Sequence, residues 1–469
     1  MAMTLWLEWF RCVRSLRASC SRSRTFAWLV LVLAALSTRL DLAGVTSFVR
    51  TLRFSSSAYR RLLHVFHSSA LSLERLTELW VQLTLRVFSP YTAGPYLVCL
   101  ADGVKAPKEG RKMPAVRSLH QSADSNSKPP FIMGHSFQAF SLLVRSASGH
   151  IAAVPLVARI HEGLVWTNRD RRTLLDRMVE LFLGFAGLWD RKVLLVADAY
   201  YASGKVIRPL LLQGHHLLTR ARMNTVAYLP PDPNPAPRRG RPRIYGAKVR
   251  LRELIAERSL LHTSPSPIAG DSHTIQYCWF DLLWRPVGHE VRFVVVKHPQ
   301  RGTIILMTTD MDLDPLDAIV LYSHRFKIET GFRQAIHVLG SYAYHFWMEA
   351  MDPIRRRSGN QHLHMKSEEY RRCVRRKMKA YDLHVQIGCI AQGLLIHLAV
   401  NHGEQVWKQF RSWLRTMDPT RPPSELVVAL TLRDTLPEFL QDGGKDRAMR
   451  KILATYSTSM KPAALRWAG

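Results

Sequence analysis

Two acidic residues stand where their carboxylates could act together on one substrate. Asp102 follows the apolar run 96–101, and Asp198 follows the apolar run 192–197. Both runs are predicted to be buried strands, and strand ends in an α/β sheet face the crevice where ligands bind. Two carboxylates there would repel each other and lose hydration, so the pair favours a divalent cation. An Asp after a strand also begins turns or caps helices, but two in one predicted sheet indicate a site.

A third acid lies on a helix predicted for residues 315–350. Tyr322, Arg325 and Glu329 are spaced at i, i+3 and i+7, which places them on one helical face. A surface helix with a local Arg–Glu ion pair would have the same spacing. Apolar residues at i+10 and i+14 continue this face, however, and indicate that it is directed toward a core or a site.

An α/β scaffold that could position these side chains is predicted after residue 90. The first acid is followed by two strand-like runs and an amphipathic helix, and the second acid by a helix and a short strand. This order, with buried central strands, predicts an α/β layered domain. The two strand-like runs are expected at residues 137–144 and 150–158, and the amphipathic helix at 171–186. The helix and the short strand after the second acid are expected at 204–213 and 216–219.

A β-rich segment separates the second acid from the third. Six prolines lie between residues 229 and 243, which predicts a linker or an exposed loop. Residues 274–284, 291–297 and 303–308 alternate in polarity or are rich in β-branched residues, and we expect them to form a small inserted sheet. Further along, the stretch 355–379 carries ten basic and two acidic residues and precedes an apolar helix at 384–400.

The first 90 residues are predicted to be helical throughout, with twelve arginines, no lysine and four acids. The segments 44–52 and 57–66 have the lengths of a helix-turn-helix, with Ser55 or Ser56 as the N-cap of the second helix. An ordinary helical hairpin fits the same pattern. The polar residues expected along the second helix are Tyr59, Arg60, Arg61 and His64.

The charge balance indicates a polyanionic partner. Lys and Arg total 66 against 36 Asp and Glu, a net charge of +30, and the pI is near 10.4. Nucleic acid is the first candidate and an anionic membrane surface the second. A hydrophobic content of 47% excludes a disordered chain. The apolar run 26–36 is shorter than the roughly 20 residues of a membrane span, and six scattered cysteines without a C-x-x-C pair suit the cytoplasm.

Together these motifs resemble the DDE transposases of bacterial insertion sequences. Asp102-Gly103 is similar to the family's first acidic motif, and Asp198-Ala199-Tyr200-Tyr201 to its second. Tyr322-x-x-Arg325-x-x-x-Glu329 looks like the Y-(2)-R-(3)-E signature of one branch, in which a β-rich insertion precedes the Glu. The resemblance covers roughly residues 30–400.

The resemblance implies an α/β, ribonuclease-H-like catalytic domain, interrupted by the β-rich insertion and preceded by a helical DNA-binding domain. It also implies a mechanism of two-metal phosphoryl transfer, in which Asp102, Asp198 and Glu329 are the catalytic acids and bind two Mg²⁺ ions, with Mn²⁺ able to substitute. Tyr322, Arg325 and Lys105 would hold DNA phosphate. The expected domains are 1–90 (helical, DNA-binding), 91–222 (first part of the core), 223–312 (Pro/Arg-rich loop and insertion), 313–402 (second part of the core) and 403–469 (C-terminal helices).

One position departs from the signature. The family pattern has a Lys seven residues beyond the Glu, and here that residue is Ile336. Arg333 or His337 is the candidate to replace it in contacting DNA. The departure keeps open the alternative of a catalytically inactive, DNA-binding relative. An unrelated RNA-binding or structural basic protein would not explain three acids in these positions.

A second DNA-binding motif lies in the Pro-rich loop. Arg239-Gly240-Arg241-Pro242-Arg243 has the core of an AT-hook, whose extended arginines enter a narrow A·T minor groove. The alternative is a basic loop that contacts phosphates without sequence preference. The expected partner is therefore double-stranded DNA, both element ends and target, bound by a homodimer in the cytoplasm at the nucleoid and away from membranes.

Overall fold

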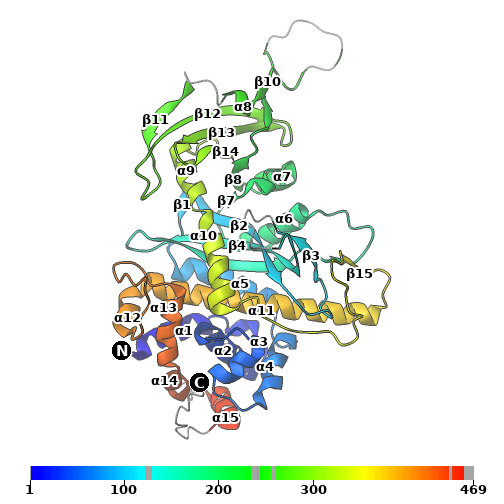
Figure 1. Cartoon of the computed structure of the whole chain (residues 1–469), viewed down its shortest axis with the longest axis vertical. Coiled ribbons are helices and arrows are strands. Elements are labelled where there is room, and N and C mark those ends of the chain that lie inside the picture. Colours follow the sequence, from blue (N-terminus) through cyan, green and yellow to red (C-terminus); the bar gives the residue numbers. More distant parts are fainter. Residues whose placement is uncertain are drawn as a thin grey trace.

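The structure is a computed structural model, and its N-terminal and C-terminal helices gather at one end while the sheet extends away from them (Figure 1). It describes residues 2–121, 129–233, 240, 243–254, 260–442 and 446–458. Most strands belong to one 13-stranded sheet with the main order β10-β9-β12-β13-β14-β8-β7-β2-β4-β3. The chain is thus a mixed α/β protein with a large, mostly antiparallel sheet.

The centre of the sheet follows the predicted order of strands and helices. β2 pairs antiparallel with β4, and β4 with β5; β2 also pairs parallel with β7, and β7 with β8. Helices α6 and α7 make the two crossovers between the parallel strands. The bounds are β2 Tyr96–Pro107, β3 Arg117–His120, β4 Phe131–Arg145, β5 Ile151–Ile160, α6 Leu174–Ala186, β7 Val193–Ala197, α7 Gly204–Leu212 and β8 His216–Ala221.

The strands expected to form a small inserted sheet are present, and they extend the central sheet. Strands β12 (Thr274–Trp284), β13 (His289–His298) and β14 (Gly302–Thr308) lie where predicted, and β14 pairs antiparallel with β8 of the central sheet. This pairing covers the edge of β8, which would otherwise expose unpaired backbone groups. Smaller elements here are β9 Val226–Tyr228, β10 Lys248–Arg250, α8 Leu251–Leu254 and β11 His262–Pro265.

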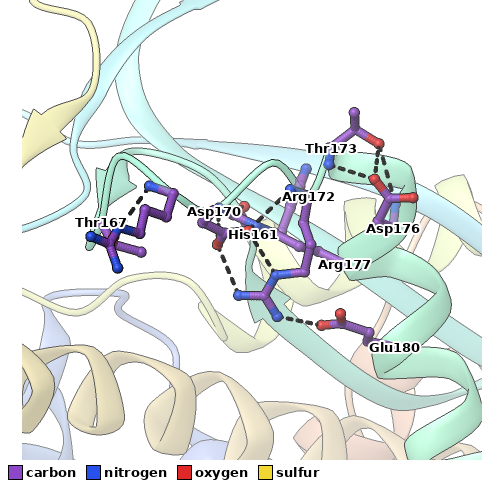
Figure 2. A network of polar contacts seen from close by, with 9 residues as sticks. His161, Thr167, Asp170, Arg172, Thr173, Asp176, Arg177 and Glu180 are labelled. Atoms are coloured by element: carbon purple, nitrogen blue, oxygen red, sulfur yellow. Dashed lines mark hydrogen bonds and ion pairs between the residues drawn. The ribbon is translucent and has the colours of Figure 1, made fainter.

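A network of ion pairs and hydrogen bonds fixes the start of α6 against the end of β5 (Figure 2). Nη1 of Arg177 donates to the carbonyl of His161 at 2.8 Å, and Arg172 pairs with both Asp170 and Glu180 at 2.8 Å. The helix begins with a capping box between Thr173 and Asp176, which satisfies two backbone N–H groups that the helix leaves free. Because α6 leads directly into β7, these contacts also position the strand that carries the second acid.

The N-terminal segment is helical, as predicted, and packs into the main hydrophobic core. Every residue of α2 from Phe26 to Thr38 is buried, and this helix packs against α11, α13 and α15, so N-terminal and C-terminal helices lie side by side (Figure 1). The helices are α1 Ala2–Arg14, α2 Ser23–Thr38, α3 Gly44–Thr51, α4 Ala58–His67, α5 Leu73–Val87, α12 Gly403–Gln409, α13 Glu425–Asp434, α14 Leu436–Asp442 and α15 Arg447–Tyr456.

The charged stretch and the apolar helix that follows it form one helix. α11 spans Glu368–Asn401; its first turns carry exposed basic residues, and from Ala380 onward it is buried almost throughout. Its most apolar window is long enough to cross a membrane, but 94% of that window is buried inside the protein. α11 is thus the central core helix of the helical layer.

Candidate active site

Asp102 lies beside Asp198 because their strands are in parallel register. Ala101 of β2 is the partner of Ala197 of β7, so the next residue on each strand is one of the acids. The prediction that the first strand ends at Asp102 is wrong: β2 continues to Pro107, still paired with β4. β7, in contrast, ends at Ala197. Asp102 therefore occupies the point where β2 loses one neighbour.

The second acid begins a short 3₁₀ turn, Ala199–Tyr201. Oδ1 of Asp198 accepts a hydrogen bond from the backbone N–H of Tyr200 at 2.9 Å. The phenol of Tyr201 is buried and donates to Oε1 of Gln138 at 2.9 Å, and Nε2 of Gln138 donates to the carbonyl of Asp102 at 3.2 Å. Tyr201 and Gln138 thus link the segments of both acids, a role that the sequence did not indicate because it depends on the pairing of β2 with β4.

The third acid lies on the second of two short helices, not on one long helix. α9 spans Pro315–Ser323 and α10 spans Phe326–Gln334. Between them, the N–H of Arg325 bonds to the carbonyl of Tyr322 at 3.1 Å, an i, i+3 bond that tightens the turn. After a π-turn, Ala335–Leu339, the helix ends at Gly340 with φ of 63°, so the predicted continuation to residue 350 is wrong.

The guanidinium of Arg325 joins the first acid to the third. Its Nη1 atom lies 3.0 Å from Oδ2 of Asp102, and its Nη2 atom lies 2.5 Å from Oε1 of Glu329. The Arg325 and Asp102 side chains are less than one-fifth exposed. The structure therefore brings Asp102, Asp198, Arg325 and Glu329 to one place, although more than 100 residues separate the second acid from the third.

Burial and neighbouring charges perturb the protonation of this group. Burial raises the pKa of Asp102 to about 6; the negative charges of Asp198 and Glu329 add to the shift, while the N–H of Gly103 and the charge of Arg325 oppose it. Burial also raises the pKa of Tyr322, whose phenol is near the charges of Arg325 and Asp198. These effects are typical of sites where charged groups converge in a cleft.

The donor set suits a hard divalent cation. Carboxylate oxygens are the ligands that Mg²⁺ and Mn²⁺ prefer, and Asp102 and Asp198 occupy adjacent positions. Among the residues that the structure describes, the three acids do not form a group with all ligand atoms within 4.8 Å of one another. The cation at the centre of the group is instead the Arg325 side chain, which would have to move for a metal ion to contact both Asp102 and Glu329.

The structure does not bring the other predicted DNA contacts to these acids. Lys105 is on the opposite face of β2 from Asp102, and its Nζ donates to the carbonyl of His120. Arg333 and His337 are exposed, and Ile336 packs against the main core, which explains why an apolar residue is tolerated at this position. In the AT-hook segment Arg243 is exposed, and Arg239 and Arg241 lie outside the described residues.

Arg39 is a buried residue that sequence reasoning missed. It is 3% exposed and extends from the end of α2 to the end of the Glu-bearing segment, where it donates to the carbonyls of Leu339 and Gly340 at 2.7 Å each. It also donates to Oγ of Ser47 at 2.9 Å. Its contacts satisfy carbonyls that the π-turn leaves free. Arg39 thereby fixes the far end of the segment that carries Glu329.

A wide basic groove begins where β2 ends. The cavity has a volume of about 780 Å³ and is open to solvent. Its basic side chains come from two segments far apart in the sequence, one directly after β2 and one near residue 355. They are Arg111, Arg355 and Arg356; Glu109 also lines the groove, and the buried ammonium of Lys108 donates to the carbonyls of Tyr342 and Tyr344.

Comparison with known proteins identifies the family. The sequence model of the DDE superfamily endonuclease family matches residues 15–263, more than half of the chain, and the protein belongs to this family. The matched region includes Asp102 and Asp198 and ends before Glu329. No curated protein matches the sequence. The family implies a nuclease of the transposase type that acts on DNA, and its enzymes generally use divalent metal ions.

Proposed function

We propose that this protein is a transposase of a bacterial insertion sequence, which cuts and joins DNA strands at the element's ends. The observation that carries the proposal is the contact of Arg325 with both Asp102 and Glu329, beside Asp198. Arg325 and Glu329 belong to the Tyr322-x-x-Arg325-x-x-x-Glu329 segment, which matches the Y-(2)-R-(3)-E signature, in a chain that belongs to the DDE superfamily.

Asp102, Asp198 and Glu329 are the residues proposed to hold two Mg²⁺ ions. The bound ions would supply activation of the attacking hydroxyl and stabilisation of the leaving 3′-oxygen. Arg325, released from the two carboxylates, is then free to donate to a DNA phosphate as a planar fork. The phenol O–H of Tyr322, next to Arg325, can donate a hydrogen bond to the same phosphate.

The topology supports a ribonuclease-H-like core. Three antiparallel strands, β2, β4 and β5, are followed by α6 and by β7, which lies parallel to β2 on its other side. α7 and a further parallel strand, β8, complete the unit. The insertion strands extend this unit beyond β8 and precede the segment that bears Glu329.

Basic surface outside the acids supports binding to double-stranded DNA. The groove lined by Arg111, Arg355 and Arg356 is one candidate path for phosphates. On α4, Tyr59, Arg60, Arg61 and His64 are all exposed, as a recognition helix requires. We propose that the N-terminal helices and the AT-hook segment bind the element ends, that the active form is a homodimer on DNA, and that it acts at the nucleoid.

The second candidate function is DNA binding without catalysis. Ile336 favours it, because an apolar residue packed against the core cannot contact a phosphate where the family pattern has Lys. All three acids are retained, however, and retention of the complete set favours the enzyme.

Substitution of the third acid tests the proposal. Glu329→Gln keeps the size of the side chain and removes its charge, so strand cleavage of terminal DNA in Mg²⁺ should fall by orders of magnitude, whereas DNA binding without metal should persist. Asp102→Asn and Asp198→Asn should behave alike, and a double variant should be little worse than a single one. The matched control is Glu349→Gln, outside the group of acids. Cleavage that survives in Glu329→Gln would exclude the assigned triad.

A further inference from the structure

A second cluster of ligand-type side chains lies in the helical layer, away from the catalytic acids. Glu8 of α1, His397 near the end of α11 and His402, between α11 and α12, each have a ligand atom within 4.8 Å of those of the other two. α1 packs against both α11 and α12. The cluster thus connects the first helix of the chain with a segment almost 400 residues later.

His397 has an unused ligand atom directed into the protein. The residue is 4% exposed, and its Nε2 atom is buried with no hydrogen-bond partner in the described part of the chain. Its Nδ1 atom, in contrast, lies 2.8 Å from Nδ2 of Asn401, and the ring also makes a hydrogen bond to the backbone at Val87. Metal-binding histidines characteristically donate the N–H of one ring nitrogen to a carbonyl or carboxylate and bind the metal through the other nitrogen, and the bond to the backbone at Val87 is of this kind.

Glu8 supplies a carboxylate oxygen to the same cluster. Its Oε2 atom is buried and forms an ion pair with Nη2 of Arg11 at 2.5 Å, but the Arg11 side chain is 72% exposed. Because Arg11 can extend into solvent at little cost, the carboxylate is accessible to a competing cation.

We propose that Glu8, His397 and His402 bind one Zn²⁺ ion, which joins α1 to the junction of α11 and α12. Two imidazoles and a carboxylate are a ligand set that zinc accepts, with water as the fourth ligand. Ligand atoms of a tetrahedral zinc site lie roughly 3.3 Å apart, so small side-chain movements would close the site.

Another cluster, in the insertion, lacks the feature that carries this proposal. Asp271, His273 and His298 also have ligand atoms within 4.8 Å. There, however, both imidazoles bond to Asp271, at 2.8 and 2.9 Å, and Nδ1 of His298 accepts from the N–H groups of Gln300 and Arg301. The hydrogen-bonding capacity of this cluster is used internally, which makes it a suitable control.

Zinc titration of the EDTA-treated, full-length protein tests the proposal. We expect one equivalent of Zn²⁺ to bind and to raise the Tm. Glu8→Gln and His402→Asn should each weaken binding by on the order of 100-fold, since loss of an outer partner alone costs about 10–100-fold, and should remove the rise in Tm. The controls His273→Asn and Asp102→Asn should bind zinc as the unchanged protein does.

Three results would overturn the zinc site. They are the absence of zinc binding to the unchanged protein, equal binding by Glu8→Gln and His402→Asn, and loss of the zinc equivalent in either control. His402 is partly exposed and Glu8→Gln is isosteric, so circular dichroism should show folded variants. Zinc binding is read without any DNA cleavage, so its result is independent of the proposed transposase activity.

Discussion

Arg325 contacts Asp102 through Nη1 at 3.0 Å while its Nη2 contacts Glu329 at 2.5 Å. One guanidinium therefore balances two carboxylates that would otherwise repel each other. Burial opposes the charged guanidinium, but the hydrogen bond to Glu329 and the charges of Glu329 and Asp102 prevail and raise the pKa of Arg325. The positive charge is permanent, so above the pKa of Asp102, about 6, a competing cation is needed to release the two acids.

This contact predicts that Arg325 and Mg²⁺ compete. Arg325→Gln should lower the free energy of unfolding without metal by about 1–3 kcal/mol, because two partly buried carboxylates lose their partner. The same variant should bind Mg²⁺ about tenfold more tightly, since no ion pair must first be broken. Urea unfolding with and without Mg²⁺ measures both effects. Arg333→Gln, an exposed side chain on α10, is the control. An equal response of Arg325→Gln and the unchanged protein to Mg²⁺ would contradict the competition.

Asp102 should make stability fall as pH rises. Its pKa in the folded protein, about 6, is above the ordinary 3.8, so the folded state binds the proton more tightly than the unfolded chain does. Proton binding by Asp102 therefore contributes to the free energy of unfolding in full below pH 4, and this contribution is lost as pH rises through 6. The difference is on the order of 1–3 kcal/mol. Asp102→Asn should remove this dependence and be more stable than the unchanged protein at pH 8. Urea unfolding at pH 5 and pH 8 measures this pH dependence, with Asp190→Asn at an exposed position as control. If Asp102→Asn has the same pH dependence as the unchanged protein, the Asp102 carboxyl is not its cause.

Arg39 should be essential for the stability of the Glu-bearing segment. Arg39→Met keeps an unbranched side chain but removes the donors to Leu339 and Gly340, leaving buried carbonyls unpaired at about 1–3 kcal/mol for each such group. We expect the free energy of unfolding to fall by about 3–5 kcal/mol in denaturant titration. Arg60→Met, at an exposed position, should change it by less than about 0.5 kcal/mol. A loss as small as that of the control would show that Arg39 does not support this segment.

The basic groove should contribute electrostatically to DNA affinity. Replacing Arg355 and Arg356 by Gln should weaken duplex binding and reduce the slope of log K against log[salt] by about 0.9 for each phosphate contact removed. Arg411 and Arg415 are also exposed, and their replacement by Gln provides the matched control. Filter binding or fluorescence anisotropy over a range of salt concentrations gives the slopes, and identical slopes in both double variants would exclude the groove as a path for DNA.

The sequence predicted the elements whose burial pattern is simple. Fully apolar runs before Asp102 and Asp198 became the paired strands β2 and β7, and the amphipathic pattern after residue 171 became α6, because burial on one or both faces leaves a clear periodicity. The continuation of β2 to Pro107 could not be predicted in this way. There the strand keeps β4 as a neighbour on one side only, and sequence periodicity does not indicate how many neighbours a strand has.

Contacts between distant segments account for the rest. The spacing of Tyr322, Arg325 and Glu329 indicated a common face, but the turn between α9 and α10 directs Arg325 toward Asp102 on another element. The pairing of β14 with β8 depends on which strand edge is free, and the partners of Arg39 lie about 300 residues away. None of these relationships has a local sequence signal.

The continuous sheet fixes how far apart the insertion and the acids lie. β12 is separated from β7 by β13, β14 and β8, and four steps of about 4.8 Å give roughly 19 Å across the strands. Trp279 of β12 is 39% exposed, whereas Asp198 directly follows β7. At 3.4 Å per base pair this spacing corresponds to about five or six base pairs of duplex. If a DNA end contacted Trp279 and the acids together, the paired strands between them would fix the distance between the two contacts. That distance would not depend on the extension of a flexible linker.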